Sequence, residues 1–150
     1  MRMGSTHTSL LYHLVFATKC REPSLRAEWS ARLHEYIGGM VVVLGGVPQG
    51  VGGVADHVHL LVGLKPTHCL SAFMRELKKA SSRWVADVMG VRSFRWQEGY
   101  GVFTVSASVK GEVQDYIARQ EEHHLRRSYR EEYMVMLRKA GVEFDERYLE

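Results

Sequence analysis

The hydrophobic periodicity changes in a definite order along the chain, and this order constrains the fold more than any other feature. Residues 9–18 alternate in character, with Leu10, Tyr12, Leu14 and Phe16 on one face. A period of two residues, with aromatic and branched side chains, predicts a half-buried strand. The folded part of the chain is therefore expected to begin with a strand.

The segments that follow switch repeatedly between strand and helix periodicity. The first of them predicts a helix that opens at Pro23-Ser24 and ends at Gly38-Gly39 or Gly45-Gly46, followed by strands over Val47–Val54 and Ala55–Leu64. The next predict a helix over Thr67–Met89 with Thr67 as N-cap, a loop over Phe94–Gly99 and a strand over Gly101–Ser108. The last predict a helix from Val109 to about Arg127 and a helical tail from Glu131. This order is the split βαβ pattern. We therefore predict an α+β, ferredoxin-like (RRM-like) antiparallel sheet with helices on one face and an added C-terminal helix, in one domain spanning residues 1–150.

Composition narrows the class of protein. The 150 residues are 45% hydrophobic and 25% charged, as in a globular domain that buries a core. The apolar runs fall short of the roughly 20 residues that a membrane helix needs. The amino terminus carries no secretory signal pattern, and Cys20 and Cys69 form no CxxC pair. We expect a cytoplasmic protein with no membrane partner.

The charge is mildly basic, and part of it is concentrated on one predicted helix face. Lys and Arg number 20 against 17 Asp and Glu, which gives a net charge of +3. A phosphate backbone could contact the basic face of the helix over Thr67–Met89, and the following loop offers cations beside Phe94 and Trp96 for unpaired bases. An ordinary solvated helix face with loop aromatics is the alternative. The candidate DNA-binding residues are Arg75, Lys78, Lys79, Arg83, Arg92 and Arg95.

Two histidines alternate on the strand over Ala55–Leu64. His57 and His59 are two residues apart, so their imidazoles point to the same side of the strand, away from Val58 and Leu60. This geometry suits two ligands of one divalent metal ion, and imidazole suits manganese, zinc and other borderline cations. The pair can also arise by chance on a solvated sheet face, so it needs support from elsewhere in the chain.

A second group of polar residues lies on the last strongly predicted helix. Tyr116 and Gln120 are four residues apart, hence one above the other on one face, with His123 and His124 one turn further on. In such a pair the tyrosine can serve as nucleophile, and the oxygen-bearing side chain one turn away can serve as third metal ligand. The alternative is a half-buried tyrosine among solvated polar neighbours.

These segments together resemble a known family. The residues that carry the resemblance, in order, are HVHLLV at 57–62, LKKASS at 77–82, WQEGYG at 96–101 with Val105-Ser106, and YIARQEEHH at 116–124. The chain is similar to the single-tyrosine HUH transposases of small insertion sequences, of the IS200-like and REP-associated tyrosine transposase types. The resemblance extends from Tyr12 to Leu149.

The resemblance implies roles for individual residues. His57 and His59 would be the two histidines of the metal site, Gln120 would complete the metal shell, and Tyr116 would be the nucleophile. The cofactor would be Mg²⁺ or Mn²⁺. Arg119 stands where the family normally has Asn, a departure that touches no expected ligand.

The implied activity is transposition of single-stranded DNA. A 5′-phosphotyrosine intermediate with a free 3′-hydroxyl would allow cleavage and rejoining without ATP. The implied partners are the hairpin ends of the protein's own element and a second copy of the chain in a homodimer. Two alternatives remain: a domesticated, non-catalytic DNA-hairpin-binding regulator, and a metal hydrolase of small phosphate esters. Hydrolysis by metal-bound water would not need Tyr116.

Overall fold

A sheet of four antiparallel strands organises the protein. The computed structural model describes residues 4–124 and 126–149. The strands are β1 (Leu11–Ala17), β2 (Val47–Val54), β3 (His57–Gly63) and β4 (Gly101–Val105), arranged in the order β2-β3-β1-β4. The two central strands, β1 and β3, pair directly, with Ala17 opposite His57 and Val15 opposite His59.

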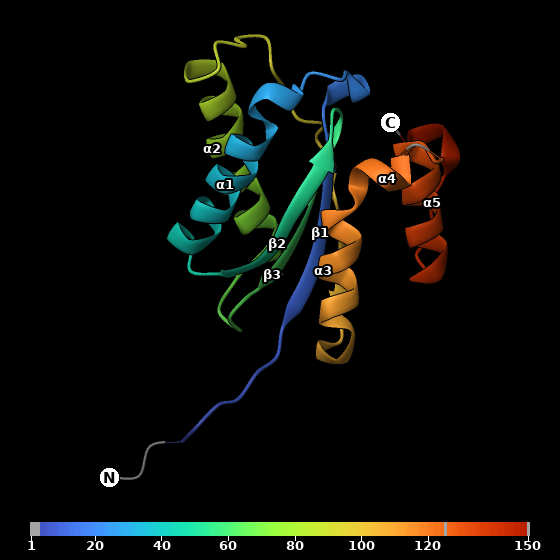
Figure 1. Ribbon diagram of the computed structural model, residues 1–150. Coiled ribbons are helices and arrows are strands. Elements are labelled where there is room, and N and C mark those ends of the chain that lie inside the picture. Colours follow the sequence, from blue (N-terminus) through green and yellow to red (C-terminus); the bar gives the residue numbers. More distant parts are fainter. Residues whose placement is uncertain (1–3, 125, 150) are drawn as a thin grey trace.

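Helices cover both faces of this sheet (Figure 1). One face carries α1 (Ala27–Val43) and α2 (Leu70–Asp87), whereas the other carries α3 (Lys110–Ala118), α4 (Gln120–His124) and α5 (Tyr129–Lys139). Three short 3-10 turns lie at Lys19–Arg21, Ala107–Val109 and Glu146–Tyr148. The element order and the strand order confirm the predicted ferredoxin-like α+β fold with an added C-terminal helical segment.

The main hydrophobic core lies between the sheet and the first two helices. Leu14 and Phe16 of β1 pack there with Val58 and Leu60 of β3, and each of the four side chains is 0% exposed. Residues of α1 and α2 at helical spacing complete the cluster: Trp29, Leu33, Ile37, Val41, Phe73, Met74, Leu77 and Val85. The alternating pattern of β1 and β3 therefore directs the intervening side chains to the opposite face.

That opposite face has a smaller apolar cluster and a polar centre. Val15 and Ala17 of β1 pack against Tyr129 of α5. Between these contacts and α3 lie His57 and His59, which are fully buried. The histidines are thus enclosed by the C-terminal helices, not exposed on a solvated sheet face.

The structure corrects two details of the predicted helices. The N-cap position of α2 is Cys69 and not Thr67, and no side chain caps this helix end. The helix predicted from Val109 to about Arg127 is broken: α3 ends at Ala118, and Arg119 has φ −104° and ψ 27°. The amide of Arg119 bonds to the carbonyls of Asp115 and Tyr116, which closes the last turn of α3 before α4 begins.

The helices give no membrane-spanning candidate. Within residues 4–124 and 126–149, none of them combines the length and the apolar character that crossing a bilayer requires.

A glycine in β2 allows α3 to approach the sheet. A Cβ built on Gly52 would lie 2.3 Å from the carbonyl oxygen of Ile117 in α3, far inside van der Waals contact. Gly52 pairs with His59 across the ladder. The glycine-rich sequence of β2 is therefore explained by the close packing of the helix that carries Tyr116.

We expect Gly52→Ala to destabilise the protein by about 2 kcal/mol or more, because backbone atoms of two elements would have to move apart. Gly39→Ala is the matched control, since Gly39 lies in the exposed part of α1, where an added Cβ would meet no atom within 4 Å. It should stabilise the helix by up to about 1 kcal/mol. Urea unfolding of both variants measures the difference, and equal stabilities would contradict the close-packing argument.

Candidate metal centre and nucleophile

The sheet places the two histidines of β3 side by side. His57 and His59 have ring centroids 5.1 Å apart and point to the face covered by α3, α4 and α5. The partners of His59 in the ladder are Val15 on β1 and Gly52 on β2. The pairing of β3 with β1 and β2 thus fixes both imidazoles on a rigid element.

The C-terminal segment brings three more polar side chains to the same place. The Oε1 atom of Gln120 lies 3.1 Å from Nε2 of His57 and 3.1 Å from Nε2 of His124. Glu132, in the first turn of α5, is only 2% exposed. Its Oε1 lies 2.9 Å from Nε2 of His59, 3.2 Å from that of His124 and 3.4 Å from that of His57. The five side chains converge on one small volume.

The Nδ1 atoms of His57 and His59, which point away from the cluster, contact other side chains. Nδ1 of His57 lies 2.7 Å from Oδ1 of Asp56, and Nδ1 of His59 lies 2.7 Å from Nε2 of His13. A carboxylate only accepts, so Nδ1 of His57 is the donor in its pair. These contacts aim both Nε2 atoms into the cluster, as outer partners do for metal-bound histidines.

The charges of the cluster follow from these contacts. Burial lowers the pKa of His13 to about 3, with a further contribution from His59, so His13 is a neutral partner. Burial also disfavours the charged form of His57, but hydrogen bonds to Asp56 and Glu132 outweigh it and raise the pKa of His57 to about 9. Burial would raise the pKa of Glu132, yet its hydrogen bonds to the histidines hold it well below its usual range. Glu132 is therefore an ionised carboxylate.

Tyr116 lies at the edge of this cluster. Its hydroxyl donates to Oε2 of Glu132, and its ring centroid is 5.8 Å from that of His59. His123 stacks on the tyrosine ring at 4.4 Å, with 28° between the planes. Burial raises the pKa of Tyr116, and the neighbouring Glu132 carboxylate raises it further. The phenol is protonated in this arrangement.

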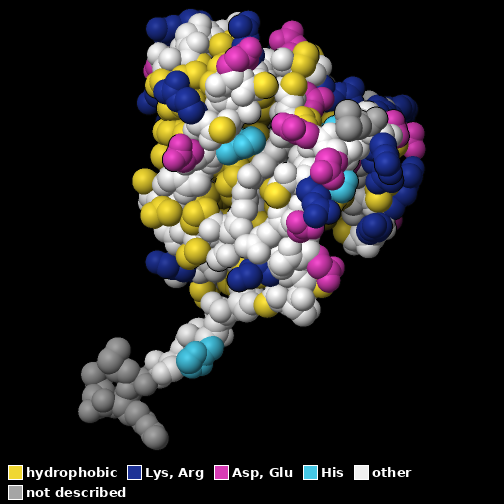
Figure 2. Space-filling model, in the orientation of Figure 1, with side chains coloured by type: hydrophobic (Ala, Val, Ile, Leu, Met, Phe, Trp, Pro, Cys, Tyr) yellow, Lys and Arg dark blue, Asp and Glu magenta, His cyan; other side chains and the backbone are white. Residues whose placement is uncertain are grey.

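Solvent reaches the tyrosine through a pocket of about 660 Å³. Tyr116, His123, Arg126 and Arg127 contribute to its walls. Nε2 of His123 is buried and has no hydrogen-bond partner among the described residues. Figure 2 shows Lys and Arg side chains gathered over the side of the molecule where α4 and α5 lie in Figure 1. The pocket therefore places two arginines beside the phenol, together with the carboxylates of Glu122 and Glu132.

The donor set fits a divalent metal ion. One ligand atom from each of His57, His59, His124 and Glu132 can be chosen so that all four lie within 4.8 Å of one another. A metal with bonds of about 2.1 Å holds neighbouring donors about 3.0 Å apart in an octahedral shell and about 3.4 Å apart in a tetrahedral one. The distances from Glu132 Oε1 to the three histidines, and from Gln120 Oε1 to His57 and His124, are 2.9 to 3.4 Å and are those of neighbouring ligands in such a shell.

The structure brings together the four residues expected for the site, His57, His59, Tyr116 and Gln120. It does so although Tyr116 and Gln120 lie on different helices. Sequence reasoning missed other members of the site: His13, His124, Glu132, Arg126 and Arg127. A Ser-x-x-Glu capping pattern at Ser128 was the available signal, because it marks the start of α5 and so places Glu132 in the first turn.

The basic residues predicted to bind DNA lie elsewhere. Those of α2 are on the helix that covers the opposite face of the sheet from the histidines (Figure 1). Arg75, Lys79 and Arg83 are exposed. Lys78 is half-buried, and its ammonium group donates to the carbonyls of Gln97, Glu98 and Gly99. Lys78 therefore holds the loop between α2 and β4.

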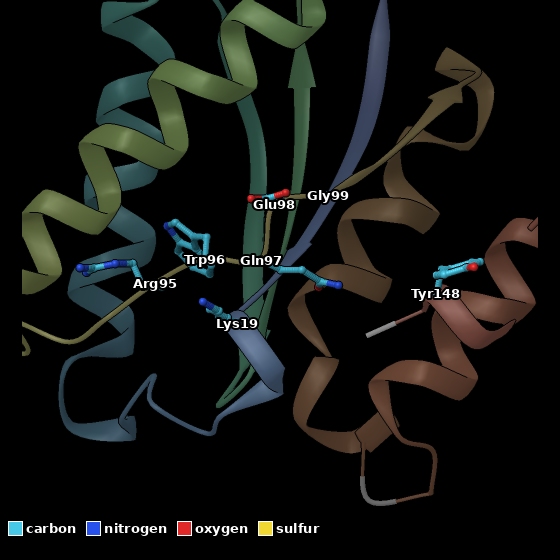
Figure 3. Close-up of a pocket in the computed structure, with 7 residues that line it drawn as sticks. All are labelled: Lys19, Arg95, Trp96, Gln97, Glu98, Gly99 and Tyr148. Atoms are coloured by element: carbon cyan, nitrogen blue, oxygen red, sulfur yellow. The ribbon is translucent and has the colours of Figure 1, made fainter. Parts of the chain in front are cut away.

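The loop after α2 lines a second pocket, of about 560 Å³ (Figure 3). Lys19 and Arg95 lie on one side of it and Tyr148 on the other. Arg95 also donates to the carbonyl of Phe94 at 2.7 Å, whereas Arg92 is exposed and pairs with Asp87 at 3.1 Å. The arginines of this loop are thus on the surface, as expected from the sequence.

The expectation that Phe94 and Trp96 offer stacking surface to bases is wrong. Phe94 is 3% exposed and Trp96 is 8% exposed, and both belong to the main core. Nε1 of Trp96 donates to the hydroxyl of Ser81 at 2.9 Å. The two rings anchor the loop because burying aromatic surface is more favourable than leaving it in water.

Comparison with known proteins identifies the class. The sequence profile of the family described as "Transposase IS200 like" matches residues 6–120. This match covers most of the chain, which therefore belongs to the IS200-like transposase family.

Individual relatives agree with this assignment. The transposase for insertion sequence element IS200 of Salmonella typhimurium is 29% identical over 126 residues, covering 80% of this chain and 82% of that protein. The ISDra2 transposase TnpA of Deinococcus radiodurans is 26% identical over 126 residues, covering 75% of this chain and 85% of that protein.

Two solved structures share the fold. A crystal structure from Deinococcus radiodurans, assigned as a transposase, has a TM-score of 0.64 and 30% identity, and covers 80% of this chain and 98% of its own. A REP-associated tyrosine transposase bound to a REP hairpin has a TM-score of 0.59 and 15% identity, with 83% and 74% coverage. The second similarity concerns the fold alone.

We expect Lys78→Ala to lower the free energy of unfolding by about 1–2 kcal/mol, because three loop carbonyls lose a charged donor. Lys79→Ala is the matched control: the neighbouring side chain is exposed, and its loss should change stability by less than about 0.5 kcal/mol. Urea unfolding compares the two variants. Equal stabilities would show that Lys78 does not hold the loop.

Proposed function

We propose that the protein cleaves and rejoins single-stranded DNA through a covalent bond between Tyr116 and a DNA 5′-phosphate, with the help of a divalent metal ion. The observation that carries the proposal is the contact of the Tyr116 hydroxyl with Glu132, whose other oxygen faces three imidazole nitrogens. A nucleophile, a proton acceptor and a metal-ligating cluster thus adjoin one another. This is the arrangement that an activated tyrosine nucleophile requires.

The chain itself provides a path for the phenol proton. Because the pKa of Tyr116 is raised, the hydroxyl needs a partner that takes its proton as the oxygen attacks phosphorus. Oε2 of Glu132 already accepts the hydrogen bond from that hydroxyl. Arg127 acts in the opposite direction, since its charge lowers the pKa of Tyr116. Glu132 is therefore the proton acceptor that the geometry offers in the proposed reaction; because its own pKa is held low, the transfer depends on groups such as Arg127 that lower the pKa of the phenol.

His57, His59 and Gln120 would hold the metal ion, Mg²⁺ or Mn²⁺, beside the tyrosine. When bound, the ion would polarise a non-bridging phosphate oxygen and offset the negative charge that develops on attack. The pocket at Tyr116 would receive the scissile phosphate, with Arg126 and Arg127 as its cations.

The proposed reaction exchanges one phosphodiester bond for another. The Tyr116 oxygen bonds to phosphorus while the bond from phosphorus to the DNA 3′-oxygen breaks, and that oxygen takes a proton to become a free 3′-hydroxyl. The 5′-phosphotyrosine retains the energy of the broken bond. A second 3′-hydroxyl can therefore reverse the step and join two strands without ATP.

Single-stranded DNA, folded as the hairpin ends of the protein's own element, is the proposed substrate. A structural relative has been solved with a REP hairpin, which supports a partner of this kind. The proposed contacts to phosphates are Arg75, Lys78, Lys79 and Arg83 of α2 with Arg92 and Arg95 of the next loop. The carbonyl contacts of Lys78 make it the least available of these.

A homodimer in the cytoplasm is the remaining element of the proposal. The edge of the sheet at β2 offers backbone groups for pairing, and an apolar patch adjoins it. Val42 is 60% exposed, Val43 is 74% exposed and Val47 is 55% exposed. This patch supports self-association of the chain.

We expect purified protein to form a covalent adduct with labelled single strands from both flanks of its gene when Mn²⁺ is present. EDTA should abolish the adduct, and so should Tyr116→Phe, because the mutant keeps the ring but lacks the nucleophilic oxygen. A denaturing gel resolves the band. Tyr36→Phe is the control, since Tyr36 stacks on Trp84 on the other side of the sheet and should leave the adduct unchanged.

The alternatives give different results in the same assay. Tight binding of hairpins without a covalent band, on substrates that span both flanks, would support a non-catalytic regulator. Cleavage that persists in the Tyr116→Phe variant would support hydrolysis by metal-bound water. Either outcome would reject Tyr116 as the nucleophile.

We expect the double variant Lys79→Ala and Arg83→Ala to bind single strands with a weaker salt dependence. If each side chain neutralises one phosphate, the slope of log K against log salt becomes less steep by about 1.4. The control removes two exposed cations outside α2, Arg26 and Lys65, and should leave the slope unchanged. Binding isotherms over a salt series measure both slopes. An unaltered slope in the α2 variant would exclude this helix from the interface.

A further inference from the structure

The site extends beyond the part of the chain that matches the family. The match ends at residue 120, whereas His124 lies at the end of α4 and Glu132 in the first turn of α5. Both reach the β3 histidines: Oε1 of Glu132 is 2.9 Å from Nε2 of His59, and Nε2 of His124 is 3.2 Å from the same oxygen. The C-terminal segment therefore contributes directly to the cluster.

The inner nitrogen of His57 is surrounded by oxygen atoms of the C-terminal segment. Nδ1 of His57 carries a hydrogen because its partner, the Asp56 carboxylate, can only accept. A neutral ring would then have a lone pair at Nε2, which faces the Oε1 atoms of Gln120 at 3.1 Å and of Glu132 at 3.4 Å. Three acceptors would face one another. Positive charge between them, from a proton or a metal ion, removes the conflict.

His124 faces the same two oxygens. Its Nε2 lies 3.1 Å from Oε1 of Gln120 and 3.2 Å from Oε1 of Glu132. The orientation of the Gln120 amide is set by its nitrogen, which donates to Oε2 of Glu132 at 3.3 Å. Its oxygen must therefore point inward. A metal ion would be met by all five inward-facing atoms at once: Nε2 of the three histidines and Oε1 of Gln120 and Glu132.

We propose that His124 and Glu132 are metal ligands alongside His57, His59 and Gln120, so that three imidazoles, a carboxylate and an amide oxygen form the metal site of this protein and favour a borderline transition-metal ion over Mg²⁺. The inference rests on the proposed function for the presence of a metal centre. Mg²⁺ prefers oxygen donors, retains several waters and demands octahedral geometry. Imidazole nitrogens suit first-row transition metals better. Glu132 would ligate through Oε1 while Oε2 stays on the Tyr116 hydroxyl.

The test is binding of Mn²⁺ to the metal-free full-length protein, without DNA. Free Mn²⁺ gives a six-line EPR spectrum that is lost on binding, so a titration gives the affinity. We expect Glu132→Gln and His124→Ala each to weaken binding by at least about tenfold. Glu131→Gln is the matched control: Glu131 is the exposed neighbour in α5, and glutamine can replace it in the helix cap. It should bind within about twofold of the unaltered protein.

Competition tests the preference for the ion. A tenfold excess of Mg²⁺ should leave most of the Mn²⁺ bound. Wild-type affinity in both Glu132→Gln and His124→Ala would overturn the proposed ligands, and displacement of half the Mn²⁺ by equimolar Mg²⁺ would overturn the preference. Circular dichroism melts in EDTA establish that each variant is folded, and the two variants alter different helices.

The proposed ligands and the proposed function can fail independently of each other. A Tyr116-dependent, metal-dependent DNA adduct, combined with unchanged Mn²⁺ affinity in the two variants, would reject the additional ligands and leave the transposase mechanism standing. Weakened Mn²⁺ binding in the variants, combined with no adduct on any strand, would leave the metal site standing and reject the mechanism.

Discussion

The alternation of side chains along β3 is the constraint on which the site depends. Val58, Leu60 and Val62 face the main core beneath α1 and α2, so His57 and His59 must face the other side. A slip of one residue in the pairing with β1 would exchange the two sets and put imidazoles into an apolar core. The burial that stabilises the domain therefore also fixes the position of the histidines. Since β3 is paired on both edges, their spacing is rigid.

Close packing of α3, α4 and α5 on the second face of the sheet then brings further polar side chains to the two histidines. Gly52 allows the backbone of α3 at Ile117 to approach β2, and this brings Tyr116 to the rim of the cluster. The break at Arg119 redirects the chain so that Gln120 and His124 both point at His57. A straight continuation of α3 would carry the later residues along its own axis. The kink is thus part of how the residues proposed to bind the metal are brought together.

Sequence periodicity predicted the sheet and the main helices because the spacing of apolar residues repeats several times within each of these elements. The histidine pair was predictable for the same reason, since it follows from strand geometry alone. Glu132 and His13 were not, because their roles depend on which elements meet in space. His13 lies 46 positions from His59 and Glu132 lies 73 positions from it. Trp96 was misread for a related reason: a loop aromatic gives no local sign that it inserts between the sheet and α2.

The arrangement also restricts how one DNA strand could use both the basic helix and the nucleophile. The exposed cations of α2 and the pocket at Tyr116 are separated by the sheet, so a strand that touches both has to pass around its margin. The pocket in Figure 3 lies at the margin where β1 ends. There Ala17 pairs with His57, and the amide of Lys19 bonds to the carbonyl of Arg95 at 3.0 Å. Lys19 and Arg95 therefore place positive charge at the end of the sheet nearest His57, between the two surfaces.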